Sequence, residues 1–385
     1  MQKHNDFKAN LLDIINKVSD TDAQIYSEKY DAALESIKPL DADDFIVSLI
    51  KGKYAHYSGK EVDANIEKLC PNYLFGNNDT AKNMGFREQG ASLAESVKNF
   101  IAAMEHYAKL YKDIAANTRE FIIYTAKINN LKGVYQAILA AHDSTDDFSN
   151  PEKRNFIAKQ YERLWVILKL NGATEFNTID NRLCLALRGV EYNEAKYREI
   201  FDNEIKKTLD NKPMLNYEIF ATNGYTNRDK TFLTFFIARV EKYLRDRSNM
   251  PADEHSKGKY SVNQLCEHYQ IDHILVRNET NRNCFTNEQE FDEKRNTLAG
   301  LLLLEKAQDI AYEEKLENYQ NSELIWAQML CRDFHETSNV KLQNICTQLP
   351  NLAEQFKPYD KFDKQALEER TKLLYELVKI IWEVE

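Results

Sequence analysis

The chain has 385 residues, which is enough for about two or three domains that each bury their own core. Only 11 glycines and 7 prolines, against many leucine, alanine, glutamate and lysine residues, favour a mainly helical protein. The net charge of −10 excludes a strongly basic nucleic-acid-binding protein, and no apolar run is long enough for a membrane helix.

The six cysteines form no Cys-x-x-Cys pair and no Cys/His spacing that is typical of zinc sites. A reducing cytosol is the simplest interpretation of unpaired cysteines. The first residues, Met1 to Asp6, lack the apolar stretch of a signal peptide. We therefore expect a soluble, cytoplasmic protein that does not contact a membrane.

The first two thirds of the chain are expected to form helices. Apolar residues recur at helical spacing from Phe7 to Ile15, from Leu93 to Tyr111 and again from Phe232 to Leu244. The polar segment 245–259 contains Pro251 and Gly258 and is therefore the predicted boundary between two domains.

Two strand signals and a helix signal follow one another between residues 260 and 320. Apolar and polar residues alternate over 269–274, as in a half-buried strand. The leucine run 301–304 follows Gly300 and is typical of a buried strand. Residues 311–319 predict a helix. Strand, loop, strand and helix is the order of a ββα-metal finger.

The polar residues in this segment suit a site that hydrolyses phosphodiesters with one metal ion. Asp272 and His273 are adjacent on the first strand, Asn296 lies in the loop, and Asp309 stands at the start of the helix. Carboxylates are hard oxygen ligands for Mg²⁺ or Mn²⁺. An unligated imidazole with a pKa near neutrality can accept a proton from water.

The same residues carry a resemblance to a known family. The quoted pattern is Tyr269-x-Ile271-Asp272-His273-Ile274, then Arg295-Asn296-x-Leu298-x-Gly300-Leu301-Leu302-Leu303-Leu304-x-Lys306, then Tyr312-x-x-Lys315-Leu316-x-x-Tyr319. It resembles the HNH-type nuclease domain at the C-terminus of GmrSD-like (type IV) restriction endonucleases. The Asp-His-Ile step is also similar to the HNH domains of RNA-guided DNA nucleases. The resemblance covers the C-terminal third well and the helical remainder only loosely.

The resemblance implies a mainly α protein with two domains. A multi-helical connector would occupy residues 1–250, and an HNH-like nuclease domain would occupy residues 256–385. Within the second domain, a small ββα-metal finger at about 260–320 would be embedded in C-terminal helices over 321–385.

By the same resemblance each candidate site residue has a role. His273 would be the general base, Asn296 would hold the finger by hydrogen bonds, and Lys315 would pair with a phosphate oxygen. Asp272 and Asp309 would hold Mg²⁺ or Mn²⁺. The candidate DNA contacts are Arg295, Lys294 and Lys306.

The implied function is a divalent-metal-dependent DNA endonuclease of a bacterial restriction or anti-phage defence system. The alternative is a catalytically degenerate helical interaction subunit of such a system. It arises from three departures: Asp309 stands where the family usually has asparagine, Ala299-Gly300 where it has Gly-Asn or Gly-Gly, and Leu275-Val276 where it has proline after His-Ile.

The family normally joins its nuclease to a ParB-like nucleotide-hydrolysing domain. The chain contains neither the Asp-Gly-Gln-Arg-type signature of that domain nor a Walker-type glycine-rich loop. We therefore expect a separate subunit, or another part of a longer protein, to supply it. Residues 1–60 are its expected docking surface.

Two arginines at 182 and 188 have two interpretations. A similar arginine-bearing helix lies in the family's connector, so Arg182 and Arg188 are candidates for contact with a nucleic acid or a partner. The alternative is an ordinary helix with a Leu/Cys/Ala face and solvated arginines, and this is the favoured interpretation.

Overall fold

The computed structural model of the chain describes residues 3–56, 60–116, 120–146, 151–248, 260–306, 319, 322–359 and 361–384. The protein is mainly helical, as predicted, and its described residues include a two-stranded sheet. The described helices include none that is long and apolar enough to cross a membrane.

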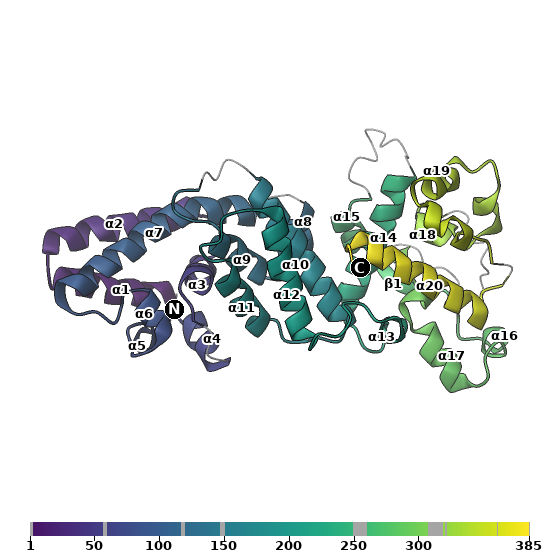
Figure 1. Cartoon of the computed structure of the whole chain (residues 1–385), viewed down its shortest axis with the longest axis horizontal. Coiled ribbons are helices and arrows are strands. Elements are labelled where there is room, and N and C mark those ends of the chain that lie inside the picture. The colour runs from purple at the N-terminus through teal and green to yellow at the C-terminus, as the bar shows by residue number, and fades with distance from the viewer. Residues whose placement is uncertain are drawn as a thin grey trace. The chain divides into compact units, whose positions relative to one another are not determined.

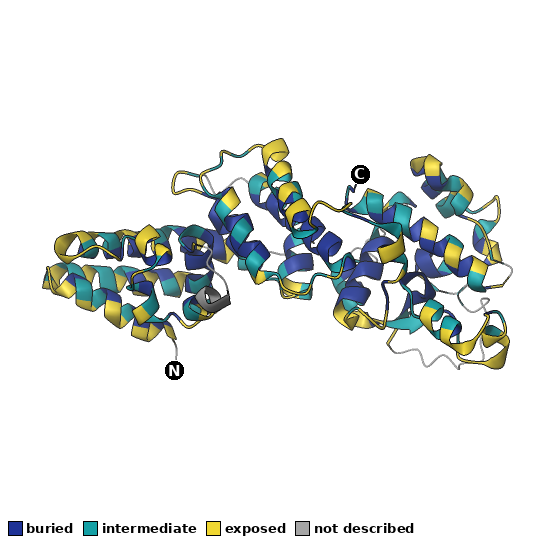
Figure 2. Ribbon diagram, turned by 60° about the horizontal axis from the view of Figure 1, so that its bottom comes forward, coloured by how far each residue is buried: buried dark blue, intermediate teal, exposed yellow. Residues whose placement is uncertain are grey.

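The chain forms two compact units. The first consists of Met1–Leu168 with Gly172–Lys212, and the second of Lys169–Asn171 with Pro213–Glu385. Within each unit the helices turn their buried residues toward one another and their exposed residues outward (Figure 2).

The first unit is entirely helical in its described residues. Its elements are α1 (Lys3–Asn16), α2 (Asp20–Ser36), α3 (Ala42–Lys53), α4 (Lys60–Glu67), α5 (Pro71–Leu74), α6 (Asp79–Asn83), α7 (Gly90–Ala116), α8 (Glu120–Ile122), η1 (Ile123–Ile128), α9 (Gly133–Ala141), most of α10 (Glu152–Leu170), α11 (Asn177–Leu187) and α12 (Glu194–Thr208). Helices α1, α2 and α7 lie side by side (Figure 1). Helix α9 packs between α3 and α11.

Arg182 lies in α11 and Arg188 caps its C-terminus, and both bind other parts of the first unit. Arg188 donates from Nε to the Gly52 carbonyl at 2.6 Å and from its two terminal nitrogens to the Lys51 and Ala55 carbonyls, both at 2.8 Å. These carbonyls lie at the end of α3, where a helix has no internal donors left and its dipole favours a cation. Arg182 pairs with Glu204 of α12. The favoured interpretation was right about a helix with a buried leucine and cysteine face, but wrong about the arginines, because neither is a solvated side chain.

The second unit is built around one long helix, α14. Its elements are α13 (Tyr217–Ala221), α14 (Lys230–Arg247), α15 (Val262–His268), β1 (Tyr269–His273), α16 (Glu279–Arg282), α17 (Glu288–Arg295), η2 (Leu298–Gly300), β2 (Leu301–Glu305), α18 (Ile325–Gln328), η4 (Arg332–His335), α19 (Val340–Gln348), η5 (Pro350–Gln355) and α20 (Lys364–Ile381). Helix α14 contacts α15, α18, α19, α20 and both strands.

The division between the units lies at 212/213, N-terminal to the boundary that the sequence predicted within 245–259. The reason is the burial of α14. Its phenylalanines Phe232, Phe235 and Phe236 are all inaccessible to solvent. Because most of its contacts are with later elements, α14 belongs with the second unit and not with a connector that ends at 250.

The two strands are confirmed at their predicted places. β1 pairs with β2 in an antiparallel register that runs from Tyr269 opposite Glu305 to His273 opposite Leu301. Leu301, Leu302 and Leu303 are buried, as expected for a leucine strand in a core. The helix predicted over 311–319 lies outside the described residues, apart from Tyr319.

The segment predicted to hold C-terminal helices, 321–385, contains several short helices and one long helix among its described residues. Glu241 of α14 lies at the start of α18, where its buried carboxylate accepts the Ile325 and Trp326 amides at 3.0 and 2.8 Å. A carboxylate at a helix N-terminus satisfies amides that have no partner within the helix. Helix α20 begins after its N-cap Asp363, as the sequence predicted.

Candidate active site

His273 ends β1 and contacts the loop residue Asn296 across the segment between the strands. The distance between His273 Nε2 and Asn296 Oδ1 is 2.8 Å. Asn296 directly follows α17, a helix that begins after the N-cap Asn287. The Nδ2 atom of Asn296 donates to the Asp292 carbonyl at 2.6 Å. The structure thus brings together two of the residues that the sequence selected.

These two contacts determine which nitrogen of His273 carries the proton. A backbone carbonyl only accepts hydrogen bonds, so the Asn296 atom that faces Asp292 must be the amide nitrogen. Asn296 therefore turns its oxygen toward His273 and accepts a hydrogen bond from Nε2. In a neutral ring the lone pair then lies on Nδ1. Among the described residues, no side chain or backbone group hydrogen-bonds to Nδ1.

The surroundings of His273 favour the neutral ring. Burial lowers its pKa, and the positive charge of Arg295 lowers it further. The hydrogen bond with Asn296 and the charge of Asp272 oppose this shift without reversing it. A histidine that is neutral at physiological pH, with an unprotonated nitrogen available, can act as a general base.

Hydrogen bonds to backbone carbonyls hold the two ends of the segment that joins the strands. Ile274 donates its amide to the Gly300 carbonyl at 3.0 Å, and Arg295 Nε donates to the Leu275 carbonyl at 2.6 Å. At Gly300 a Cβ atom would lie 2.3 Å from the Arg295 carbonyl oxygen, so the turn η2 packs on the end of α17 only with glycine there. These hydrogen bonds and this close approach therefore set the positions of His273 and Asn296.

Asp272 is the carboxylate next to His273. It is partly exposed and makes no hydrogen bond or ion pair with any residue that the structure describes, yet it lies close enough for its charge to act on His273. Mg²⁺ is commonly held by one or two protein carboxylates together with substrate phosphates, and Asp272 fits such a ligand. The described residues contain no cluster of three or more His, Cys, Asp or Glu side chains that would hold a metal by itself.

The remaining predicted site residues have different positions. Asp309 and Lys315 lie outside the described residues. Lys306 follows β2 at the end of the hairpin away from His273, and its Nζ donates to the Glu267 carbonyl at 2.6 Å. Lys294 lies in the last turn of α17, next to Arg295.

Sequence reasoning missed two residues near His273. The ring of Tyr225 lies 5.0 Å from the imidazole, centroid to centroid, with 63° between the ring planes. Arg277 forms an ion pair with Asp292 at 3.0 Å and also lowers the pKa of His273. Tyr225 belongs to a loop before α14, and no periodicity or motif in the sequence links that loop to the strand.

Comparison with known proteins gives no match, either to a protein-family model or to a curated protein. The candidate site is therefore argued from its own geometry.

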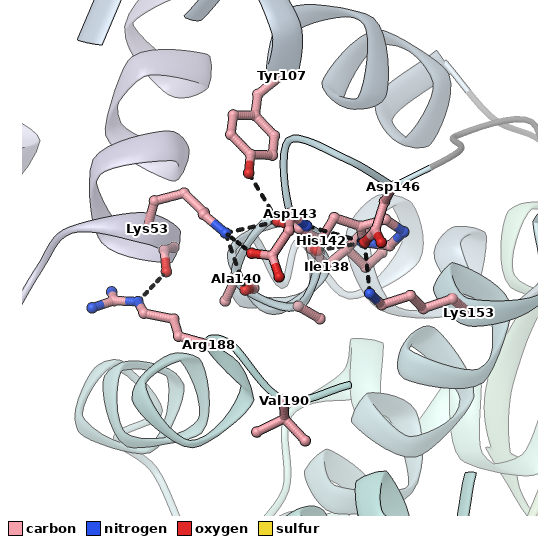
Figure 3. A network of polar contacts seen from close by, with 12 residues as sticks. Lys53, Tyr107, Ile138, Ala140, His142, Asp143, Asp146, Lys153, Arg188 and Val190 are labelled. Carbon is pink, nitrogen blue, oxygen red and sulfur yellow. Dashed lines mark hydrogen bonds and ion pairs between the residues drawn. The ribbon is translucent and has the colours of Figure 1, made fainter. Parts of the chain in front are cut away.

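A second cluster of polar residues lies in the first unit, at the end of α9 (Figure 3). Lys53 Nζ and the Tyr107 hydroxyl both donate to the His142 carbonyl, at 2.7 and 2.9 Å. The His142 ring donates from Nδ1 to the Ile138 carbonyl at 2.8 Å. Because these donors end on backbone carbonyls of a helix C-terminus, the cluster closes α9 and is a structural feature.

This cluster predicts a loss of stability in mild acid. Burial lowers the pKa of His142 to about 4, whereas an unfolded histidine has a pKa of about 6.5. Between these two pKa values, His142 binds a proton in the unfolded chain but not in the folded chain. The free energy of unfolding therefore falls as the pH falls. We expect the free energy of unfolding to drop by about 2 kcal/mol more between pH 7 and pH 5 in the wild type than in His142→Asn, whose amide keeps the donor. Equal losses in urea titrations of the two proteins would contradict this.

Proposed function

We propose that the second unit is an HNH-like endonuclease that hydrolyses DNA phosphodiesters with Mg²⁺ or Mn²⁺, in a bacterial restriction or anti-phage defence system. The observation that supports this most is the contact between His273 and Asn296, which leaves Nδ1 of a neutral histidine as a proton acceptor. We also propose that β1 and β2 belong to a ββα finger.

The chain's own residues have separate tasks in this proposal. His273 accepts a proton from the water that attacks the phosphorus atom, and Asn296 keeps the ring in the tautomer that this step needs. Arg295 and Arg277 place positive charge beside the site and favour approach of a phosphodiester. A metal ion held by Asp272, with Asp309 as the second proposed ligand, would supply charge stabilisation at the leaving oxygen.

A partner would complete the system. The net charge of −10 leaves little general attraction for DNA. We infer that a ParB-like nucleotide-hydrolysing subunit or domain contributes DNA binding and the response to nucleotide.

The direct test is incubation of the purified chain with supercoiled plasmid. We expect nicked or linear product with Mg²⁺ or Mn²⁺ and none with EDTA, at a low rate because the net charge of −10 weakens DNA binding. Agarose gels over a time course measure both. If no product forms with either metal at any protein concentration, while the protein is folded, the degenerate interaction subunit becomes the better description.

A further inference from the structure

The loop before α14 forms one side of the candidate active site. Its Tyr225 ring packs against His273, as described above, while 36% of the residue stays exposed. An aromatic side chain that is exposed but held in place can bind a substrate favourably, because the side chain loses little conformational entropy on binding.

Backbone hydrogen bonds fix this loop on the segment that carries Asn296. The Tyr225 amide donates to the Asn296 carbonyl and the Leu298 amide donates to the Asn223 carbonyl, both at 2.8 Å. A Cβ atom at Gly224 would lie 1.9 Å from the Asn296 carbonyl oxygen, so only glycine permits this approach. The position of Tyr225 relative to His273 is thus determined by the backbone and does not depend on the ring contact alone.

A cation stands beside the tyrosine. Lys230 is the first residue of α14, and its Nζ lies 5.5 Å from the centre of the Tyr225 ring. Lys230 is exposed and forms no ion pair with any carboxylate in the described part of the chain. An exposed cation–π contact is worth only about 0.5–1 kcal/mol, so the ammonium stays available for a stronger anionic partner such as a phosphate.

We propose that Tyr225 and Lys230 hold the nucleotide next to the scissile phosphate, with the ring packing on its sugar or base and the ammonium binding its phosphate. Nucleic-acid strands stack their bases on aromatic side chains and bind cations through their phosphates, and Tyr225 and Lys230 supply one group of each kind. This inference rests on the proposed function, because that function supplies the DNA. Arg295 and Arg277 also lie close enough to His273 for their charges to act on it, with Arg277 paired to Asp292.

The test is DNA binding measured apart from cleavage. The full-length protein is titrated against a fluorescein-labelled 20-base-pair duplex, by fluorescence anisotropy, with Ca²⁺ in place of Mg²⁺ and at several salt concentrations. We expect Tyr225→Leu to weaken binding about tenfold and Tyr225→Phe to leave it nearly unchanged. Lys230→Gln should lower the slope of log affinity against log salt by about 1, and Lys230→Arg should restore it.

Matched controls lie on α14 itself. Tyr243 carries the cation of Arg247 over its ring at 3.4 Å, as Tyr225 carries that of Lys230. Lys242 is a lysine of the same helix that forms an ion pair with Asp246 at 2.6 Å. Tyr243→Leu and Lys242→Gln should bind DNA like the wild type. Thermal unfolding of every variant, followed by circular dichroism, excludes loss of fold as the cause.

The outcomes separate this inference from the proposed function. Wild-type cleavage together with unchanged binding in Tyr225→Leu and Lys230→Gln would overturn the inference and leave the endonuclease intact. Weaker binding in these variants, with no cleavage by any protein, would support the contact and remove the endonuclease. A wild-type protein that does not bind the duplex would also overturn the inference.

Discussion

In the proposed endonuclease, replacing His273 by alanine should lower the rate of DNA cleavage by a factor of about 10²–10⁴, the range that a positioned general base contributes. The reason is the tautomer that Asn296 enforces, in which Nδ1 is the proton acceptor. Alanine removes this acceptor. The measurement is the rate of plasmid nicking with Mg²⁺ or Mn²⁺ under single-turnover conditions.

Two further variants make the result specific. His268 is an exposed histidine at the end of α15, just before β1, and His268→Ala should cleave like the wild type. Asn296→Ala keeps the base but releases its ring, so we expect an intermediate loss of about tenfold to a hundredfold in the rate with little change in DNA affinity. A His273→Ala protein that cleaves within about threefold of the wild type would exclude His273 as the base.

The strands of the site could be predicted because their signal is local. The alternation over 269–274 and the leucine run 301–304 each reflect the burial of one short segment, and both strands form where expected. The sequence selected His273 and Asn296 as candidates but did not predict that their side chains are in contact. This contact depends on how α17 ends and on the close approach at Gly300, and neither is encoded in a periodic pattern.

The boundary between the units could not be predicted in the same way. A polar segment with proline and glycine indicates a loop, but it does not indicate which elements the preceding helix packs against. Helix α14 is apolar on several faces and packs into the second unit, whereas 245–259 looked like the natural linker. Tyr225 was missed for the same reason, since its relation to His273 arises only when the loop before α14 docks on Asn296.

The role of an arginine is also ambiguous in a sequence, because its side chain can be solvated, bind a nucleic acid or bind the carbonyls at a helix end. Arg188 binds three carbonyls at the end of α3, a role that depends on residues far away in the chain. Only the folded structure shows that its donors are occupied. Surface charge inferred from a sequence therefore overstates the number of cations that are available for a nucleic acid.

Arg370 is a buried arginine that connects α20 to the turn η2. Only 1% of the residue is exposed, and its guanidinium lies 3.6 Å from the centre of the Trp326 ring. It donates from Nε to the Ala299 carbonyl at 3.1 Å and from Nη2 to the Trp326 carbonyl at 3.0 Å. Burial lowers its pKa to about 9, and among the described residues no carboxylate pairs with it. A cation kept at such a place is expected to matter for the geometry of the turn η2.

We therefore expect Arg370→Ala to lower the free energy of unfolding by about 3–5 kcal/mol, because it leaves two buried carbonyls without donors and opens a cavity over Trp326. Arg370→Met fills the same space without donors and should lose less, about 1–3 kcal/mol, while Lys372→Ala on the exposed side of α20 should stay within about 0.5 kcal/mol. Urea unfolding followed by tryptophan fluorescence measures all three. A loss below about 1 kcal/mol in Arg370→Ala would show that the turn, and with it the segment that carries Asn296, is held without this arginine.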